Sequence, residues 1–217
     1  MQVYIFFLFS VSPFLTIRCQ TVSFELEDCP QAGYWTLPII ASYLSEVNPA
    51  NNPYQERIDH LWSNILNHYF PLRDGFGTER EAFVKPPRRF ATNVAITNVR
   101  PLGMHKVVLV EAKTFPRNTD IGWFSVYPWA DVESILQSFM KKAPDTFGNV
   151  QTMYGIVAVG DRGRFYTMNS QNNTGGILTP FPVGGPQPLL SVHTDAHSIH
   201  AILTAISLEI RTGWNTY

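Results

Sequence analysis

Three stretches of the chain repeat apolar residues at intervals of three and four, the pattern of an amphipathic helix. They run over residues 58–69, 132–140 and 196–210. Pro53 and Pro71 stand just outside the first stretch, where prolines commonly bound a helix. Asp131 suits the N-cap of the second, and Lys141 and Lys142 suit its C-terminus. The sequence therefore predicts three long helices, and a shorter one within residues 36–47.

Other stretches are typical of strands. The run Val107–Val110 is wholly aliphatic, as in a strand buried on both faces of a sheet. We also expect strands over residues 80–85, 93–99, 154–159 and 164–168, with glycine-containing turns at 73–78 and 160–163. Short links predict that the first three strands form an antiparallel meander, and a helical crossover then leads to a strand parallel to 107–110. The expected fold is of the α/β (α+β) class, a mixed β-sheet core flanked by helices.

With 217 residues, 45% of them hydrophobic, the chain is long enough for one sizeable domain. Residues 1–19 form an apolar leader, in which the nearly all apolar run 3–17 has the length of a signal-peptide core. They indicate either a secretory leader, which makes the protein secreted, or an N-terminal element of an intracellular protein that packs on the domain. We expect residues 20–54 to be an extension packing on the core and residues 55–217 to be the main domain. No interior stretch predicts a transmembrane span.

Charge and cysteine content narrow the choice of partners. The formal net charge is −1, so no global basic field attracts nucleic acid, and phosphate contacts must be local. Arg88–Arg89 and Lys141–Lys142 are candidates for such contacts, although ordinary surface charge explains each pair equally well. Cys19 and Cys29 could form one disulfide or remain thiols, and no Cys/His spacing predicts a zinc site.

The candidate chemistry lies where the aliphatic run ends. Glu111 and Lys113 follow it two residues apart, so both side chains point to the same face of a strand. A carboxylate can hold a hard divalent cation, and a nearby ammonium can position water or stabilise charge on a phosphate. The alternative is a simple salt bridge at a strand end.

The predicted order of helix, strand, strand, strand, helix, strand, with Glu-x-Lys ending the third strand, resembles the PD-(D/E)XK nuclease superfamily. It resembles in particular uncharacterised fungal proteins that carry such a domain. The resemblance covers about residues 55–168 and is carried by LVEAK (109–113), WADVESILQSFM (129–140) and YGIVAVGDRGRFY (154–166). It implies a restriction-endonuclease-like fold and Mg²⁺-dependent hydrolysis of phosphodiester bonds in nucleic acid, either DNA or RNA.

The same resemblance implies roles for particular residues. Glu111 would be a metal ligand, Lys113 a catalytic base or positioning group, and Gln137 an orienting group. Glu56 would supply the acid of the first helix, with Asp59 as the second choice.

One residue departs from the family pattern. Where the family has an Asp on the second strand, this chain has Asn93, whose carbonyl oxygen can bind a cation without contributing charge. Two functions stay open, an active or impaired nuclease and a catalytically degenerate nuclease-fold domain that acts as a binding or interaction module.

Two other groups of residues are weaker candidates for a site. His193, His197 and His200 share a flank of the last helix and could bind a metal, but a solvated polar face is the favoured interpretation. Trp123 and Trp129 could stack on bases, although tryptophans at such positions are more often part of the core.

Overall fold

A computed structural model describes residues 32–85, 90–100, 103–147, 152–169, 176–181 and 188–213 of the protein. The predictions for the apolar leader 1–19, for the two cysteines and for Arg88–Arg89 lie outside the described residues.

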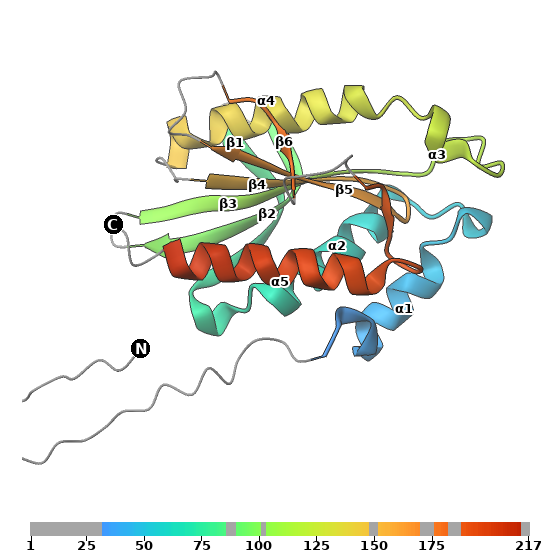
Figure 1. Cartoon of the computed structure of the whole chain (residues 1–217), viewed down its shortest axis with the longest axis horizontal. Helices are drawn as coiled ribbons and strands as arrows, with labels where there is room; N and C mark the ends of the chain where they lie inside the picture. The colour runs from blue at the N-terminus through green and yellow to red at the C-terminus, as the bar shows by residue number, and fades with distance from the viewer. Residues whose placement is uncertain are drawn as a thin grey trace, which may run out of the picture.

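A mixed seven-stranded sheet forms the centre of the molecule (Figure 1). Its strand order is β1-β2-β3-β4-β5-β6, and β7 pairs with β5. The bounds are β1 Phe76–Lys85, β2 Phe90–Arg100, β3 Gly103–Lys113, β4 Thr152–Val159, β5 Arg162–Asn169, β6 Thr179–Pro180 and β7 Leu190–Ser191. Strands β1, β2 and β3 are antiparallel neighbours, and β4 lies parallel to β3. The predicted meander and crossover are therefore confirmed.

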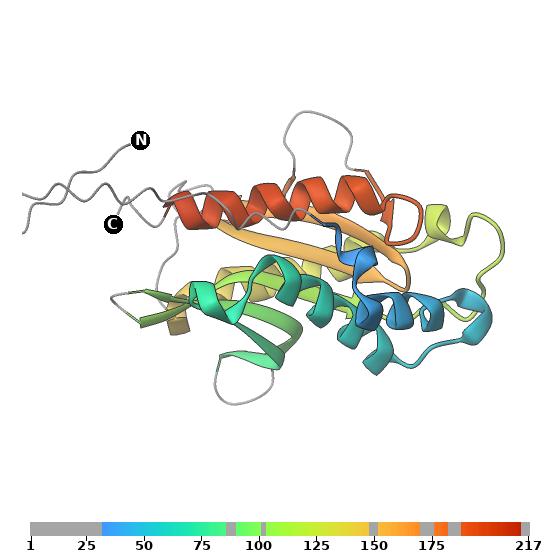
Figure 2. The same cartoon turned by 90° about the horizontal axis from the view of Figure 1, so that it is seen from below.

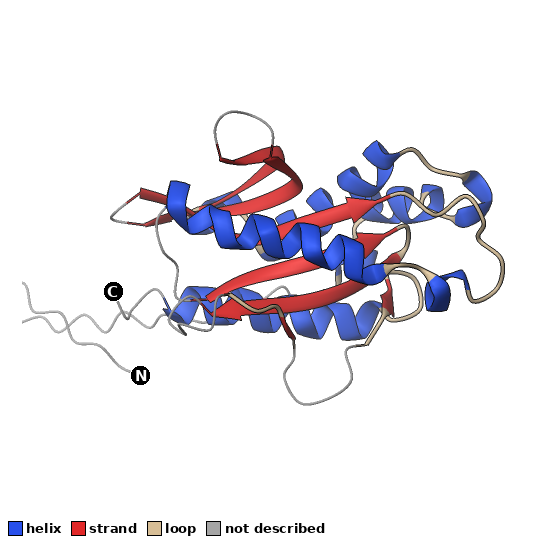
Figure 3. Cartoon of the chain, turned by 90° about the horizontal axis from the view of Figure 1, so that it is seen from above, coloured by secondary structure: helices blue, strands red, loops and turns tan. Residues whose placement is uncertain are grey.

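Helices cover both faces of this sheet. The bounds are α1 Pro38–Glu46, α2 Gln55–Tyr69, α3 Trp123–Val126, α4 Trp129–Phe147 and α5 Ala196–Gly213. Helix α4 lies across one face, and α2 and α5 lie on the other (Figures 1 and 3). Two glycines show how closely they approach, since a Cβ at Gly155 would meet Leu136 and Met140 of α4, and one at Gly163 would meet Trp62 of α2. The fold is thus of the α/β (α+β) class, with a mixed sheet between helical layers.

The described part of the N-terminal extension packs on this core. It contains two 3₁₀ helices, η1 Tyr34–Thr36 and η2 Pro49–Asn51, on either side of α1. Ile40 and Val47 are fully buried, and the Tyr34 hydroxyl donates a 2.8 Å hydrogen bond to the carbonyl of Val192. Figure 2 shows this segment against α2 and the start of α5.

At two element boundaries the structure overrides a turn or end signal of the sequence. Strand β1 begins at Phe76, within the predicted turn, because Phe76 and Gly77 pair with Asn98 and Thr97 of β2 and Phe76 is buried. Helix α4 continues past Lys142 to Phe147 with Pro144 inside it. Ala143 is buried on the sheet side, so packing sustains the helix there although Pro144 lacks a backbone donor. Within the described residues, no helix combines the length and apolar character needed to cross a membrane.

Candidate functional site

Glu111 and Lys113 form an ion pair at the carboxyl end of β3. Lys113 Nζ lies 2.6 Å from Glu111 Oε1, as expected for side chains on one face of a strand. Glu111 is almost completely buried, whereas the Lys113 side chain is 39% exposed. The second carboxylate oxygen, Glu111 Oε2, is buried and has no hydrogen-bond partner among the described residues. A buried acceptor without a partner is costly, so this oxygen is where a cation or a water molecule would be stabilising.

The register of the sheet gives this pair its surroundings. Glu111 is the register partner of Val157 in β4, and Val157 is the register partner of Arg164 in β5. Arg164 Nη1 donates a 2.7 Å hydrogen bond to Glu133 of α4, so this row of residues faces α4. The guanidinium of Arg164 also lies 4.8 Å from the centre of the Trp129 ring. A second positively charged side chain, that of Arg164, therefore lies two strands from Lys113 on the same face of the sheet.

The electrostatics of Glu111 follow from its burial. Removal from water raises the pKa of this carboxyl group above its ordinary value, and the hydrogen bond and charge of Lys113 oppose the increase. The negative charge of Asp59 raises the pKa further. The direction shows that the ionised carboxylate is under-compensated, which favours a positively charged ligand at this position.

Asp59 is the acid of α2 that lies near Glu111. It is 5% exposed, and its Oδ1 accepts a 2.8 Å hydrogen bond from Gln55 Nε2. Helices α2 and α4 cover opposite faces of the sheet (Figures 1 and 3), and Asp59 acts on Glu111 through its charge, which raises the pKa of Glu111.

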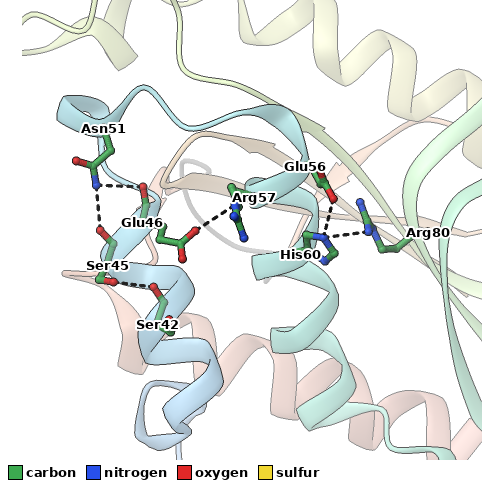
Figure 4. Close-up of polar contacts among 8 residues, drawn as sticks. All are labelled: Ser42, Ser45, Glu46, Asn51, Glu56, Arg57, His60 and Arg80. Carbon is green, nitrogen blue, oxygen red and sulfur yellow. Dashed lines mark hydrogen bonds and ion pairs between the residues drawn. The ribbon is translucent and has the colours of Figure 1, made fainter.

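Glu56, the acid that the sequence favoured, is placed differently. Its side chain is 70% exposed and lies 3.2 Å from His60, which in turn lies 3.2 Å from Arg80 Nη1 (Figure 4). The neighbouring Arg57 pairs with Glu46 of α1. Glu56 thus belongs to a surface contact between α2 and β1, whereas Asp59 is the α2 acid whose charge acts on Glu111.

Asn93 lies beside β3, but its carbonyl oxygen is already used. The β2–β3 pairing runs from Arg100–Gly103 to Val94–Val110, so Asn93 is the next residue along β2, opposite Glu111. Its Oδ1 accepts a 2.9 Å hydrogen bond from the backbone N–H of Ala112. In the described structure Asn93 therefore holds the backbone between Glu111 and Lys113, and it offers a cation no charge.

Gln137 lies away from this group. Its Nε2 donates a 3.0 Å hydrogen bond to the carbonyl of Gly176. A Cβ at Gly176 would meet Met168 of β5, and β5 is two strands from β3. The structure thus gives Gln137 a contact with the segment before β6 and does not place it at Glu111.

The other candidates from the sequence make contacts elsewhere in the fold. His193 Nε2 contacts the carbonyl of Val47, His197 packs against Trp35, and His200 pairs with the Tyr69 hydroxyl. Trp123 and Trp129 are buried and belong to an aromatic cluster with Tyr127. In the part of the chain that the structure describes, no three His, Cys, Asp or Glu side chains are grouped so as to hold a metal ion.

Sequence reasoning missed one residue at the site, Gln55. Its Nε2 donates to Asp59 Oδ1 and, over 2.9 Å, to the carbonyl of Ala112. Gln55 and Asp59 are four apart on α2, a spacing at which Gln and Asp side chains pair on a helix. The four-residue spacing could have predicted the bond to Asp59. The bond to Ala112, 57 positions away, could not be predicted from the local sequence.

The residues present fit a single hard cation of the Mg²⁺ type, but only with few protein ligands. Glu111 offers a buried oxygen without a hydrogen-bond partner in the described structure, and the charge of Asp59, whose Oδ1 is bonded to Gln55, acts on Glu111. Mg²⁺ commonly binds through one or two carboxylates and keeps several waters, so a cation at Glu111 would take most of its ligands from water.

Comparisons with known proteins add no assignment: no family model matches the chain, and no curated protein or solved structure gives a significant match.

Proposed function

We propose that this protein is a nuclease-like domain that hydrolyses phosphodiester bonds of nucleic acid with one bound divalent cation. The observation that carries the proposal is the buried, unpartnered oxygen of Glu111 beside Lys113, at the end of the third strand of the meander. Support also comes from the order of the elements, in which α2, three antiparallel strands, α4 and a parallel strand follow one another. That order is the one implied by the resemblance to the PD-(D/E)XK superfamily.

Each residue of the site would have a distinct task. Glu111 and Asp59 would hold the cation, which would supply positive charge to the phosphoryl oxygens as negative charge builds on them. The partly exposed Lys113 ammonium would donate a hydrogen bond to the attacking water and orient it. Arg164, fixed by Glu133 and Trp129 on the same face, would contact a neighbouring phosphate.

A second function has its own supporting observation. Asn93 uses its oxygen on the Ala112 backbone, so one ligand that the family supplies is absent. A domain that lost its cation would retain the fold as a surface for binding nucleic acid or protein.

One experiment separates the two functions. Mg²⁺ and Mn²⁺ are titrated into the protein by calorimetry, and labelled single- and double-stranded DNA and RNA are tested for cleavage. We expect saturable binding and cleavage in the wild type, and loss of both in Glu111→Gln. Glu56→Gln, which changes an exposed acid of α2, is the matched control and should behave like the wild type. Absence of binding at millimolar cation would reject the hydrolase and leave the binding module.

A further inference from the structure

The backbone of Ala112, between Glu111 and Lys113, is held by side chains on both of its polar groups. Regular β2–β3 pairing reaches only Val94–Val110. Beyond it, Asn93 Oδ1 accepts from the Ala112 N–H and Gln55 Nε2 donates to the Ala112 carbonyl. Side-chain amides from β2 and α2 thus take the place of the missing strand partner.

The two bonds made by Gln55 converge on one nitrogen atom. Nε2 lies 2.8 Å from Asp59 Oδ1 and 2.9 Å from the Ala112 carbonyl oxygen. Carboxylate and backbone carbonyl oxygens are both ligands of hard cations, which bind them at about 2.0–2.1 Å for Mg²⁺. A cation that binds these two oxygens together would lie in the space that Nε2 now fills.

We propose that the Gln55 amide is a built-in occupant of the cation position and competes with a divalent cation for Asp59 and the Ala112 carbonyl. This inference rests on the proposed function, because it concerns the same site. With no cation bound, Gln55 donates to both oxygens at once and compensates part of the cost of burying them. When a cation binds, the amide has to turn away.

The surroundings of Gln55 allow that movement. It is the first residue of α2, is only partly buried, and follows Tyr54, which is 84% exposed. Lys113 plays a similar part at the other acid, because its ammonium donates a hydrogen bond to Glu111 Oε1. The site therefore carries its own positive and partially positive groups, and a cation that binds Asp59 and the Ala112 carbonyl has to displace the Gln55 amide.

The test is Mn²⁺ titration by calorimetry into wild type, Gln55→Ala, and Gln55→Ala combined with Asp59→Asn. We expect Gln55→Ala to bind Mn²⁺ about five- to tenfold more tightly than the wild type, because two competing hydrogen bonds are removed. The added Asp59→Asn should abolish the gain. Gln137→Ala, which removes an amide bond to Gly176 away from the site, should leave the affinity unchanged.

A second readout uses melting temperature. In EDTA, Gln55→Ala should melt below the wild type, and added Mn²⁺ should raise its Tm by more than it raises that of the wild type. If Gln55→Ala does not fold, Gln55→Asn replaces it, because Asn is one methylene shorter and cannot bridge the two oxygens.

The outcomes distinguish this inference from the proposed function. If the wild type binds Mn²⁺ and Gln55→Ala binds it with equal or lower affinity, the inference alone is overturned. Gln55 then supports the site instead of competing with the cation. Binding by Gln55→Ala but not by the wild type supports the inference and shows that the native site is closed. No binding by either protein overturns the inference together with the cation-dependent function.

Discussion

At the scale of single residues, the oxygen atoms around the end of β3 differ in their hydrogen-bond partners. Ala112 O and Asp59 Oδ1 share a donor, Glu111 Oε1 has Lys113, and Glu111 Oε2 has no partner in the described structure. Because buried acceptors normally have donors, Glu111 Oε2 is the oxygen of this group that a water molecule or a cation would stabilise.

Asn93→Asp should strengthen cation binding. An Asp oxygen can still accept the hydrogen bond from the Ala112 N–H, and the substitution adds a carboxylate opposite Glu111. We expect the Mn²⁺ affinity to rise by about tenfold, since affinity at such sites follows the number of charged ligands. Calorimetry measures it, with Asn64→Asp on α2 as the control for added charge. An affinity equal to that of the wild type would show that no cation lies near residue 93.

Glu111→Gln should stabilise the fold at neutral pH. The folded pKa of Glu111 is raised by burial, so above that pKa the ionised side chain destabilises the folded state relative to the unfolded chain. At pH 7 we expect the Tm to rise by about 2–4 °C, the change that about 1 kcal/mol produces in a domain of this size.

The gain from Glu111→Gln should shrink as the pH falls through the raised pKa, and it should vanish below the ordinary carboxyl pKa, where Glu111 is protonated in both states. Melting curves between pH 7 and about pH 4 test this, with Glu56→Gln as the exposed control. A lower Tm for Glu111→Gln at pH 7 would mean that the Lys113 ion pair outweighs the cost of burial.

At the scale of elements, two histidines of α5 lie among the contacts that join η1 to α2 and α5. Tyr69 accepts a hydrogen bond from the backbone N–H of Tyr34, and its hydroxyl pairs with His200 Nδ1 at 2.8 Å. Trp35 packs edge-on against His197 and His200. Burial lowers the pKa of His200, and the charges of His68 and His197 lower it further.

Acidification should therefore weaken the attachment of η1. A lowered folded pKa means that the stabilising contribution of His200 is complete above its ordinary pKa and is lost as the pH falls through the folded value. His200→Gln retains an acceptor for Tyr69 but cannot be protonated. Between pH 7 and about pH 5 we expect the Tm of the wild type to fall by about 2–4 °C more than that of His200→Gln.

His60→Gln, which changes a histidine paired with Glu56 on the surface, serves as the control for the acid titration. Equal pH profiles for the wild type and His200→Gln would exclude His200 as the group responsible.

At the scale of the whole molecule, the close packing of α4 on the sheet depends on a glycine in β4. Gly155 lies in the middle of β4, and a Cβ there would come within 2.8 Å of atoms of both Leu136 and Met140. Helix α4 also presents Glu133 to Arg164, so its position affects the face on which Glu111 lies.

Gly155→Val should destabilise the fold by about 1–3 kcal/mol, the usual cost of overpacking a core. Chemical denaturation measures the change. Gly77→Ala is the matched control, because Gly77 is also a strand glycine but has no atom within 4 Å of the position that a Cβ would take. We expect that substitution to be neutral or slightly stabilising. Equal effects of the two substitutions would show that α4 repacks without cost.

The periodic patterns of this sequence were enough to predict the α2, α4 and α5 helices, the meander and the parallel β3–β4 pair, because burial of an apolar stripe or run fixes local structure. The same patterns misplaced the start of β1 and the end of α4, where pairing with Asn98 and burial of Ala143 override glycine and lysine signals. Boundaries depend on contacts from other segments, and a local window does not contain them.

The candidate site could likewise be predicted only in part from the sequence. The proximity of Glu111 and Lys113 follows from two-residue alternation along one strand, so it could be predicted from the sequence. Packing between distant segments is what brings the charge of Asp59, and not that of Glu56, to bear on Glu111, and what sets the contacts of Asn93 with backbone and of Gln137 with Gly176. It also decided that Gln55 joins α2 to β3. These outcomes depend on how a helix is rotated and where strands part, which is set by packing between segments far apart in the chain.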